Sequence, residues 1–320
     1  MEERGSMTVT WPDEVDEILG GDLAAALAYV TPAGGTVLTP VAPIGLRDRE
    51  AGTVGFTTSL GFGRKLERIA ANPRVALAYH VRAHGLSKRP GFVLVQGRAE
   101  AQPTSEALLT ELGEQATAYL GAPRRGLFWD RWLSAYYVDR ILVTVAVQRI
   151  LWWPTDDVSG EPVAIGAALA GQPSSQAPPA KGTDSRIDTA KVVNGLRAPH
   201  RLIGWTGGDG HPVVVPLGTI TAQTDRIDLV AKGGLVPGGA RRAALLAHDY
   251  RAQLVGLSEH HALGWMTADS DRGLVAFRPH SRGGFVAPPN KTLLLLANGF
   301  LARRGLKRAR ATQRKSRLDG

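Results

Sequence analysis

Apolar and polar positions alternate through most of the first 60 residues, with one helical segment in front. Over residues 13–19, Val15, Ile18 and Leu19 recur at helical spacing, with Asp13 as the expected N-cap and two glycines at the end. Three short runs of β type follow, separated by turns of glycine, proline or charged residues; they are 24–31, 36–44 and 53–58. This pattern predicts an antiparallel meander.

Helical and alternating segments continue to residue 153. Leu66 and Ile69 predict a helix that begins near Arg64 and that Pro73 ends. Alternation predicts strands over 75–81, 91–101 and 140–153, and helical spacing predicts helices from Thr104 and over 127–138. We interpret the aromatic residues of 127–138 as core packing or as a helix over a barrel mouth. Residues 1–155 are therefore predicted to form a small β-barrel with a few helices.

Residues 156–190 change in composition. They are rich in proline, glycine and serine, which cannot bury much surface, so we interpret them as a linker. Within them, the sequence favours a helical turn only over Ala164 to Ala170.

The second half of the chain carries a weak internal repeat of the first. The stretch 241–251 copies 64–74: each opens with two basic residues, and an arginine follows ten positions after the first. Upstream, Pro216 matches Pro40, and downstream 274–285 resembles the strand that closes the first barrel. Two related barrels are therefore predicted.

The second copy, residues 191–300, is predicted to be degenerate. It lacks the long helical insertion, and its loop over 232–239 has lost the hydroxyls of residues 57–59. A basic tail, residues 301–320, follows it.

The composition excludes several kinds of chemistry. The 320 residues are 43% hydrophobic and 21% charged, which is ordinary for a globular protein of two domains. The absence of cysteine excludes disulfides, cysteine-based zinc sites, iron–sulfur clusters and thiol nucleophiles. No apolar run of 18 residues and no secretory signal occurs, so we expect a cytoplasmic location and no membrane partner.

The net charge of +9 is concentrated at one end. The last 18 residues hold eight Lys or Arg against the single acid Asp319, which leaves the remainder almost neutral. We interpret the tail as a solvated terminus, with loose binding of the tail to nucleic acid or an anionic surface as the alternative. No aromatic residue accompanies these charges to stack on bases, so nucleic acid is not expected as a partner of the folded body.

Residues 57–65 combine the groups that a phosphate requires. Glycines let backbone amides approach an oxyanion, and a helix start adds its dipole to two full charges. The contributing residues are Thr57, Thr58, Ser59, Gly61, Gly63, Arg64 and Lys65. A Rossmann fingerprint would need glycine in place of Leu66, and no Walker A string occurs. The stretch therefore predicts a cradle for a terminal phosphate.

The same stretch resembles a known family. Its pattern F-T-T-S, G-R-K and N-P-R-V-A-L, with T-P-V at 39–41 and V-Q-G-R-A at 95–99, is similar to the pyridoxamine 5'-phosphate oxidase-like, FMN-binding split-barrel superfamily. The resemblance covers about residues 14–155, and 198–300 resemble the family faintly. It implies a mainly β fold of two tandem split β-barrels of the FMN-binding type with peripheral helices. The implied cofactor is FMN, with the deazaflavin F(420) as the alternative.

The resemblance also implies which residues contact the cofactor. Arg64 and Lys65 match the family's phosphate-binding pair, and Thr57, Thr58 and Ser59 match the strand end that contacts phosphate and ring. The residues that would border the isoalloxazine are Pro40, Val41, Ala42 and Pro43. Two extra residues near Phe62 and Gly63 lengthen the loop before the basic pair. The substrate-binding arginine and histidine of pyridoxamine-phosphate oxidases have no counterpart that we can locate, and no catalytic residue is assigned.

We predict a flavin-dependent oxidoreductase that transfers hydride through FMN or the deazaflavin to a small-molecule substrate. The alternative is a non-catalytic protein on the same fold that carries a flavin, haem or lipid. The second barrel is expected to act as the partner of the first within the chain, and pairing of two chains stays open as a homodimer. The histidine pairs 80 and 84, and 260 and 261, are interpreted as structural, with no metal site.

Overall fold

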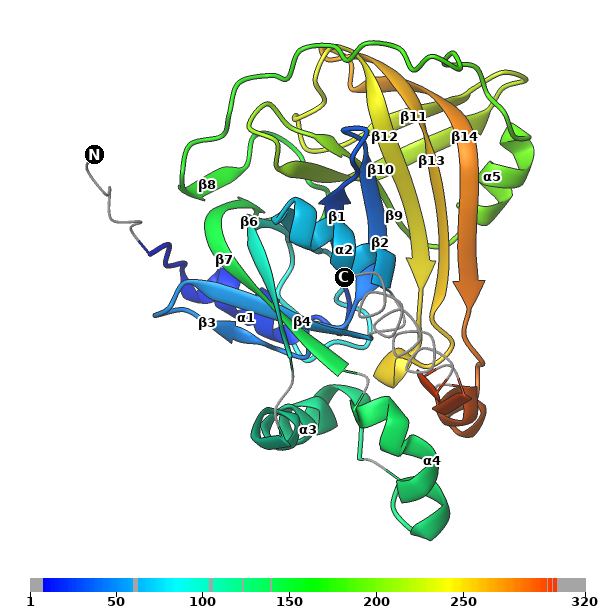
Figure 1. Ribbon diagram of the computed structural model, residues 1–320. Coiled ribbons are helices and arrows are strands. Elements are labelled where there is room, and N and C mark those ends of the chain that lie inside the picture. Colours follow the sequence, from blue (N-terminus) through cyan, green and yellow to red (C-terminus); the bar gives the residue numbers. More distant parts are fainter. Residues whose placement is uncertain are drawn as a thin grey trace, which may run out of the picture.

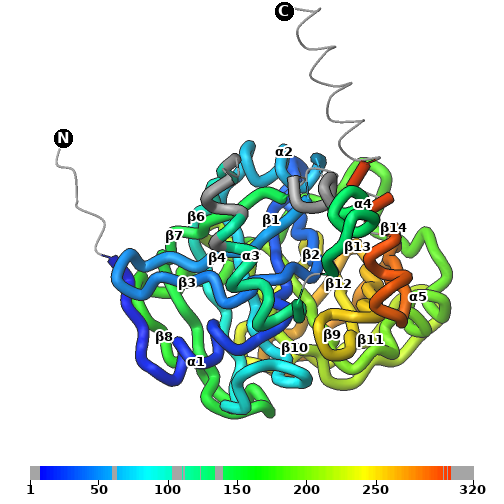
Figure 2. The backbone as a smooth tube through the Cα atoms, turned by 90° about the horizontal axis from the view of Figure 1, so that it is seen from below, coloured from blue at the N-terminus to red at the C-terminus, as the bar shows by residue number. Residues whose placement is uncertain are grey.

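The computed structural model describes residues 8–59, 63–103, 106–122, 124–138, 140–297, 299–300 and 302–303. Two β units lie side by side, with helices at the periphery (Figure 1). Seen along the perpendicular direction, the first unit, blue to green, lies beside the second, yellow to orange (Figure 2). The basic tail beyond 303, Gly61, Phe62 and Thr104 fall outside the described residues.

The first unit is an open, strongly curved sheet with helices at its ends. Its elements are α1 (Asp13–Gly21), β1 (Ala25–Val30), β2 (Thr36–Val41), β3 (Arg47–Asp48), β4 (Thr53–Ser59), α2 (Gly63–Ala71), β5 (Arg74–Tyr79), β6 (Phe92–Pro103), α3 (Glu106–Leu120), α4 (Leu127–Val138) and β7 (Arg140–Trp153). The strand order is β2-β1-β5-β6-β7-β4-β3. In the described residues, a single bridge, Ala42 to Thr57, joins the segment after β2 to β4. The barrel is therefore split between β2 and β4.

Alternation along the strands fills this barrel. Leu27, Leu77 and Val95 face inward with α1 and the α2 residue Ile69, and all are buried. α3 covers the lower end, where Leu112 and Tyr119 pack on a small separate cluster. One local expectation is wrong: Asp13 is the first helical residue, and Pro12 occupies the N-cap position without a side-chain cap.

The second unit is a closed barrel. It consists of α5 (Thr189–Gly195), β9 (His200–Thr206), β10 (Pro212–Ala222), β11 (Ile227–Ala231), β12 (Gly239–Asp249), the 3₁₀ turn η2 (Ala252–Leu254), β13 (Ser258–Asp269) and β14 (Leu274–Val286). The cyclic order is β10-β11-β14-β13-β12-β9. Residues 291–297 form a further helical segment.

The two units repeat one topology. The hairpins β1–β2 and β9–β10 have equal turns, because Val30 pairs with Thr36 and Thr206 with Pro212. Pro40 and Pro216 each lie four positions after the first residue of their strand, which confirms the match expected from the sequence. The later strands also correspond, with one β-bulge at the same place in each unit, before Gly97 in β6 and before Gly264 in β13.

The predicted equivalence of 241–251 with 64–74 is wrong. Arg241 and Arg242 lie in β12, a strand that pairs with β9 and β13 along its length. The registers instead place Arg242 at the position of Arg74 in β5. Periodicity misled here because the apolar run that follows Arg242 is buried inside a sheet, and a short buried run fits a strand or a helix equally well. The α2 helix has no counterpart, since residues 232–238 form a loop.

The linker also differs from expectation. A helical turn was expected over residues 164–170, but Val163–Gly166 form a short strand, β8. This strand pairs with residues 149–152 of β7. Strand β4 pairs with β7 only as far as Ala146, so residues 149–152 of β7 keep free hydrogen-bonding groups on that side, which an extended segment satisfies.

Small side chains let the units pack closely. Ala26, Ala28, Ala76 and Ala78 on the outer face of β1 and β5 are buried in one cluster with residues of β9, β10 and β12. No helix in the described part of the chain is long and apolar enough to cross a membrane.

Candidate functional site

The split of the first barrel faces the second unit. Strand β13 passes beside β2, and its Leu263 packs against the core of the first barrel. Thr39 Oγ1, on β2, donates a hydrogen bond to Glu259 Oε2, on β13, at 3.3 Å. The mouth of the split is therefore lined by both units, and α2 lies over the end of the first barrel on this side (Figure 1).

The structure brings the two predicted groups of cofactor residues together. The Thr57 amide donates to the Ala42 carbonyl at 3.3 Å, so the segment Pro40 to Ala42 adjoins the end of β4. Pro40 and Ala42 are half-buried, while Val41 belongs to the barrel core.

The three hydroxyls at the end of β4 do not share one face. Thr57 and Ser59 lie on the same side of the strand, half-buried, opposite Leu142 and Arg140 of β7. Thr58 lies on the other side and is buried, with Val54 and Phe56, towards the barrel interior. Thr57 and Ser59 are therefore the hydroxyls available at the mouth of the split.

The start of α2 adds two cations of different character. Arg64 is exposed, whereas Lys65 is 9% exposed although it carries a charge. The pKa of Lys65 is lowered to about 8, mainly by burial; the carboxylate of Glu259 opposes this shift, and Arg140 adds to it. A lysine held in this way favours an added negative charge beside it.

Arg140 is a site residue that the sequence did not predict. It begins β7 opposite Ser59, and its Nη1 makes a long hydrogen bond of 3.5 Å to Thr57 Oγ1. Burial lowers the pKa of its guanidinium to about 10. Its position as the first residue of the closing strand, next to the end of β4 in a meander, was the available signal.

The second unit contributes an acid and a base. Glu259 is 5% exposed, and its Oε1 lies 3.0 Å from His261 Nδ1. A Cβ on Gly283 would lie 2.6 Å from His261 Nε2, so the imidazole occupies space that any larger residue at 283 would fill. From the sequence, His261 was interpreted as a structural residue, because nothing in the chain order places the start of β13 beside the first barrel.

Tyr29 completes this side of the mouth. Burial raises the pKa of its phenol, and the nearby Arg68 and Arg64 act in the opposite direction. The mouth thus gathers cations from α2 and β7, hydroxyls from β4, and an acid and imidazole from β13.

The equivalent mouth on the second barrel is filled. In the strand order, β6 and β7 of the first unit correspond to β13 and β14 of the second. Phe92 on β6 and Trp153 on β7 pack edge to face, with ring centroids 5.5 Å apart. Trp153 Nε1 donates to the carbonyl of Gly160 at 3.1 Å, and a Cβ on Gly233 would lie 3.2 Å from the same ring. Aromatic packing and the linker therefore occupy the place where a second cradle would lie.

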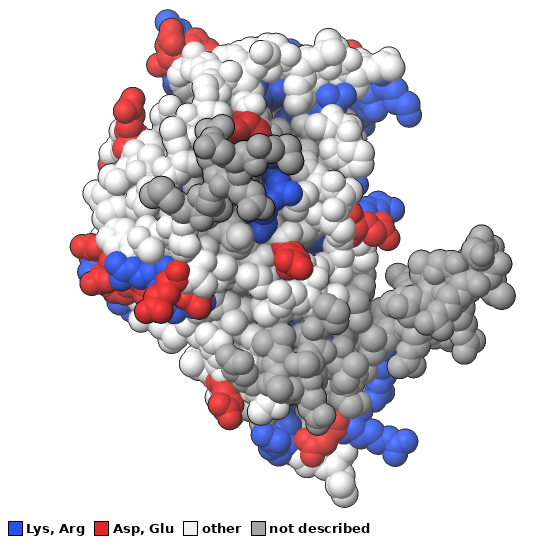
Figure 3. Space-filling model, turned by 60° about the vertical axis from the view of Figure 1, so that its left-hand side comes forward, with Lys and Arg blue, Asp and Glu red and all other residues white. Residues whose placement is uncertain are grey.

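Charge elsewhere is dispersed. On the face drawn in Figure 3, Lys and Arg are interspersed with Asp and Glu. The described residues hold no group of three or more His, Asp or Glu placed for a metal ion.

Comparison with known proteins gives matches in structure alone. No family model matches the chain, and no curated protein matches it. A conserved hypothetical protein, Rv2991 from Mycobacterium tuberculosis, aligns over 48% of this chain and 90% of its own, with 18% identity and a TM-score of 0.35. A putative pyridoxamine 5'-phosphate oxidase from Listeria innocua aligns over 45% and 98%, with 14% identity and a TM-score of 0.32. An F(420) reductase aligns over 44% and 98%, with 19% identity and a TM-score of 0.31.

Proposed function

We propose that the mouth of the first barrel binds a phosphate-bearing flavin, FMN or the deazaflavin, and that the protein is a flavin-dependent oxidoreductase acting on a small molecule. The observation that carries the proposal is the convergence of Lys65, Arg140 and the α2 start on the Thr57 and Ser59 hydroxyls. Two desolvated cations beside hydroxyls and a helix start are a donor set that fits a phosphate dianion.

Each group has a role in this proposal. Lys65, Arg140 and the exposed Arg64 would hold the phosphate, with the hydroxyls of Thr57 and Ser59. The segment Pro40 to Ala42 would border the ring. The bound flavin supplies the redox chemistry, so the protein needs to provide only placement, electrostatics and shielding.

Glu259 and His261 would together accept or supply the proton that is transferred along with the hydride. Glu259 Oε1 at 3.0 Å from Nδ1 holds the imidazole with Nδ1–H towards the carboxylate, which leaves Nε2 to hold or release a proton. Because both residues come from β13, the second barrel supplies the acid–base groups and the first supplies the anion cradle.

A binding experiment tests the proposal. We expect purified protein to bind FMN or the deazaflavin, measured by absorption and by fluorescence quenching, and Lys65→Gln with Arg64→Gln to weaken binding by about a hundredfold or more, because two charge-assisted contacts are lost. Arg49→Gln is the matched control, since Arg49 pairs with Asp13 on an exposed part of the first unit. Failure of the wild-type protein to bind either flavin would refute the proposal.

Reduction of the bound flavin separates an enzyme from a carrier. In an oxidoreductase, a nicotinamide donor reduces the flavin and an acceptor reoxidises it, and His261→Gln slows turnover without weakening flavin binding. A protein that binds flavin without turnover with any donor would be the non-catalytic carrier.

A further inference from the structure

Each hairpin turn between the first two strands of a unit docks on the other unit. The β9–β10 turn, residues 207–211, lies on the first unit beside Arg74, and the β1–β2 turn, residues 31–35, lies on the second beside Arg242. The turns share their backbone: Gly34 and Gly210 both have positive φ, of 75° and 82°, and each donates to the carbonyl three positions before it. Asp209 thus corresponds to Ala33, and His211 to Gly35.

On the first unit, polar side chains of the turn fill the docking surface. Asp209 Oδ2 accepts from Arg149 Nη2 at 2.7 Å, and His211 Nε2 lies 2.9 Å from Gln148 Oε1. Gln148 is the extra residue of the β-bulge opposite Gly97. A carboxylate and an imidazole therefore neutralise and close this surface.

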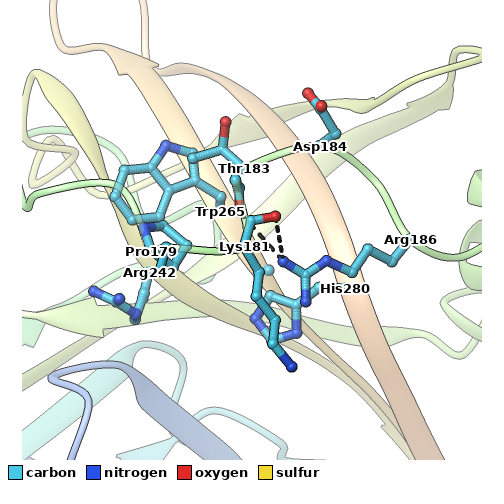
Figure 4. A pocket seen from close by; sticks show the side chains of 11 residues that line it. Pro179, Lys181, Thr183, Asp184, Arg186, Arg242, Trp265 and His280 are labelled. Atoms are coloured by element: carbon cyan, nitrogen blue, oxygen red, sulfur yellow. Dashed lines mark hydrogen bonds between the residues drawn. The ribbon is translucent and has the colours of Figure 1, made fainter.

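On the second unit, the corresponding side chains are absent from the turn. Ala33 and Gly35 stand where Asp209 and His211 stand in the other copy, and the bulge residue equivalent to Gln148 is His280. A cavity of about 180 Å³ lies over this bulge, with Trp265, His280 and Arg242 on the barrel and residues 179–186 of the linker above them (Figure 4).

The residues that line the cavity carry more positive than negative charge. Lys181, Arg186 and Arg242 line it, and in the described part of the chain none of them forms an ion pair. Arg242 Nη1 donates to the neutral Gln176 Oε1 at 3.3 Å. Asp184 is the one acid among the lining residues, and Figure 4 shows its carboxylate directed away from His280 and Lys181.

His280 lies close to these cations. Burial lowers the pKa of His280, and Arg186 and Arg242 lower it further. Arg242 also lies 5.7 Å from the ring centre of Trp265, so one wall is aromatic.

We propose that this cavity is a binding site for a small dianion, a dicarboxylate or a phosphate ester, whose oxyanions are held by Lys181, Arg186 and Arg242. A cavity of about 180 Å³ suits a small ligand of this kind. The site is separate from the proposed flavin site, since it lies on the second barrel under the linker.

Calorimetric titration with malonate and with inorganic phosphate tests the proposal, using the full chain. We expect at least one of the two to bind, and Arg242→Gln and the pair Lys181→Gln with Arg186→Gln each to weaken binding by about tenfold or more, the effect of losing a charged contact. Arg226→Gln is the matched control, because Arg226 lies on the same barrel and pairs with Asp228 and Asp225. Malonate binding alone identifies a dicarboxylate, and phosphate binding alone a phosphate ester.

A second readout guards against misfolding of the variants. Lys181 and Arg186 are exposed on the linker, so their replacement leaves the barrel core intact. A bound dianion raises the pKa of His280, which nuclear magnetic resonance reports directly. The calorimetric titration is repeated with the variants Arg64→Gln and Lys65→Gln of the proposed flavin site. We expect both variants to bind the anion in the second-barrel cavity as the wild-type protein does. Absence of binding by both anions, or unchanged binding in Arg242→Gln and the linker pair, overturns the proposal.

Discussion

Lys65 shows how burial changes the chemistry of a single side chain. A lysine at the surface keeps its proton to a pH near 10.5, but burial and the nearby Arg140 bring the pKa of Lys65 to about 8. Glu259, from the other barrel, compensates only part of this cost. The residue is therefore charged at neutral pH but close to losing its proton, and an anionic ligand would restore the balance.

This position predicts the pH dependence of flavin binding. Above about pH 8, the free protein has lost the Lys65 proton and must regain it to hold a phosphate, so affinity is expected to fall by up to about tenfold per pH unit. Fluorescence titration with FMN between about pH 7 and pH 9.5 measures the fall.

Lys65→Arg is the diagnostic variant. Arginine keeps its charge throughout this pH range, so the affinity of the variant for FMN is expected to stay constant with pH. A fall of equal steepness in the arginine variant would show that another group titrates.

At the level of strands and helices, the β-bulges mark the repeat most clearly. A Cβ on Gly97 would lie 2.2 Å from the Ala146 carbonyl oxygen, and one on Gly264 would lie 2.4 Å from the Arg278 carbonyl oxygen. Both contacts are with backbone, which cannot swing aside. The bulge that bends each barrel thus requires glycine at the same point in both copies.

Alanine at either bulge is expected to destabilise the protein. Gly97→Ala and Gly264→Ala should each lower the free energy of unfolding by about 2 kcal/mol or more, because the backbone must move to admit the methyl group. Urea denaturation measures the change.

Gly113→Ala is the control for the bulge variants. Gly113 lies in α3, and a Cβ added there would meet nothing within 4 Å, so alanine should stabilise by up to about 1 kcal/mol. Equal losses at all three positions would contradict the role of the bulges.

For the molecule as a whole, equivalent histidines meet where the two units join. The strand registers give His80, after β5, the position of His248 in β12, and their Nε2 atoms lie 2.9 Å apart. His80 Nδ1 lies 3.1 Å from the Ala78 carbonyl oxygen and donates to it, so His80 Nε2 accepts from His248. Contact between equivalent residues is typical of a two-fold axis.

This pair predicts lower stability in acid. Burial lowers the pKa of His80 well below its usual value and that of His248 to about 3, so the folded state binds fewer protons than the unfolded state as pH falls below about 6.5. Stability should therefore fall with decreasing pH by about 1.4 kcal/mol per pH unit for each histidine kept neutral. Urea unfolding between about pH 5 and pH 8 measures the slope.

His248→Gln should reduce this slope by about one proton, since the amide can donate to His80 but does not titrate. His84→Gln is the matched control, because His84 is exposed and lies outside the junction. A slope that His248→Gln leaves unchanged would assign the acid sensitivity to other groups.

Local patterns were enough to predict most elements and the tandem organisation. The closing strand over 140–153 and the helix over 127–138 match their predicted bounds, because long alternation and helical spacing each allow a single solution. The phosphate cradle at residues 57–65 stays a prediction from the sequence, because the groups that it combines are neighbours in the chain.

Only the tertiary structure decided which groups lie around the predicted cradle and which positions of the two copies correspond. Arg140, Glu259 and His261 reach the mouth through strand pairing and docking between barrels, and such long-range contacts leave no spacing in the sequence. The burial that tunes Lys65, and the absence of a helix between β11 and β12, likewise depend on how the two barrels pack.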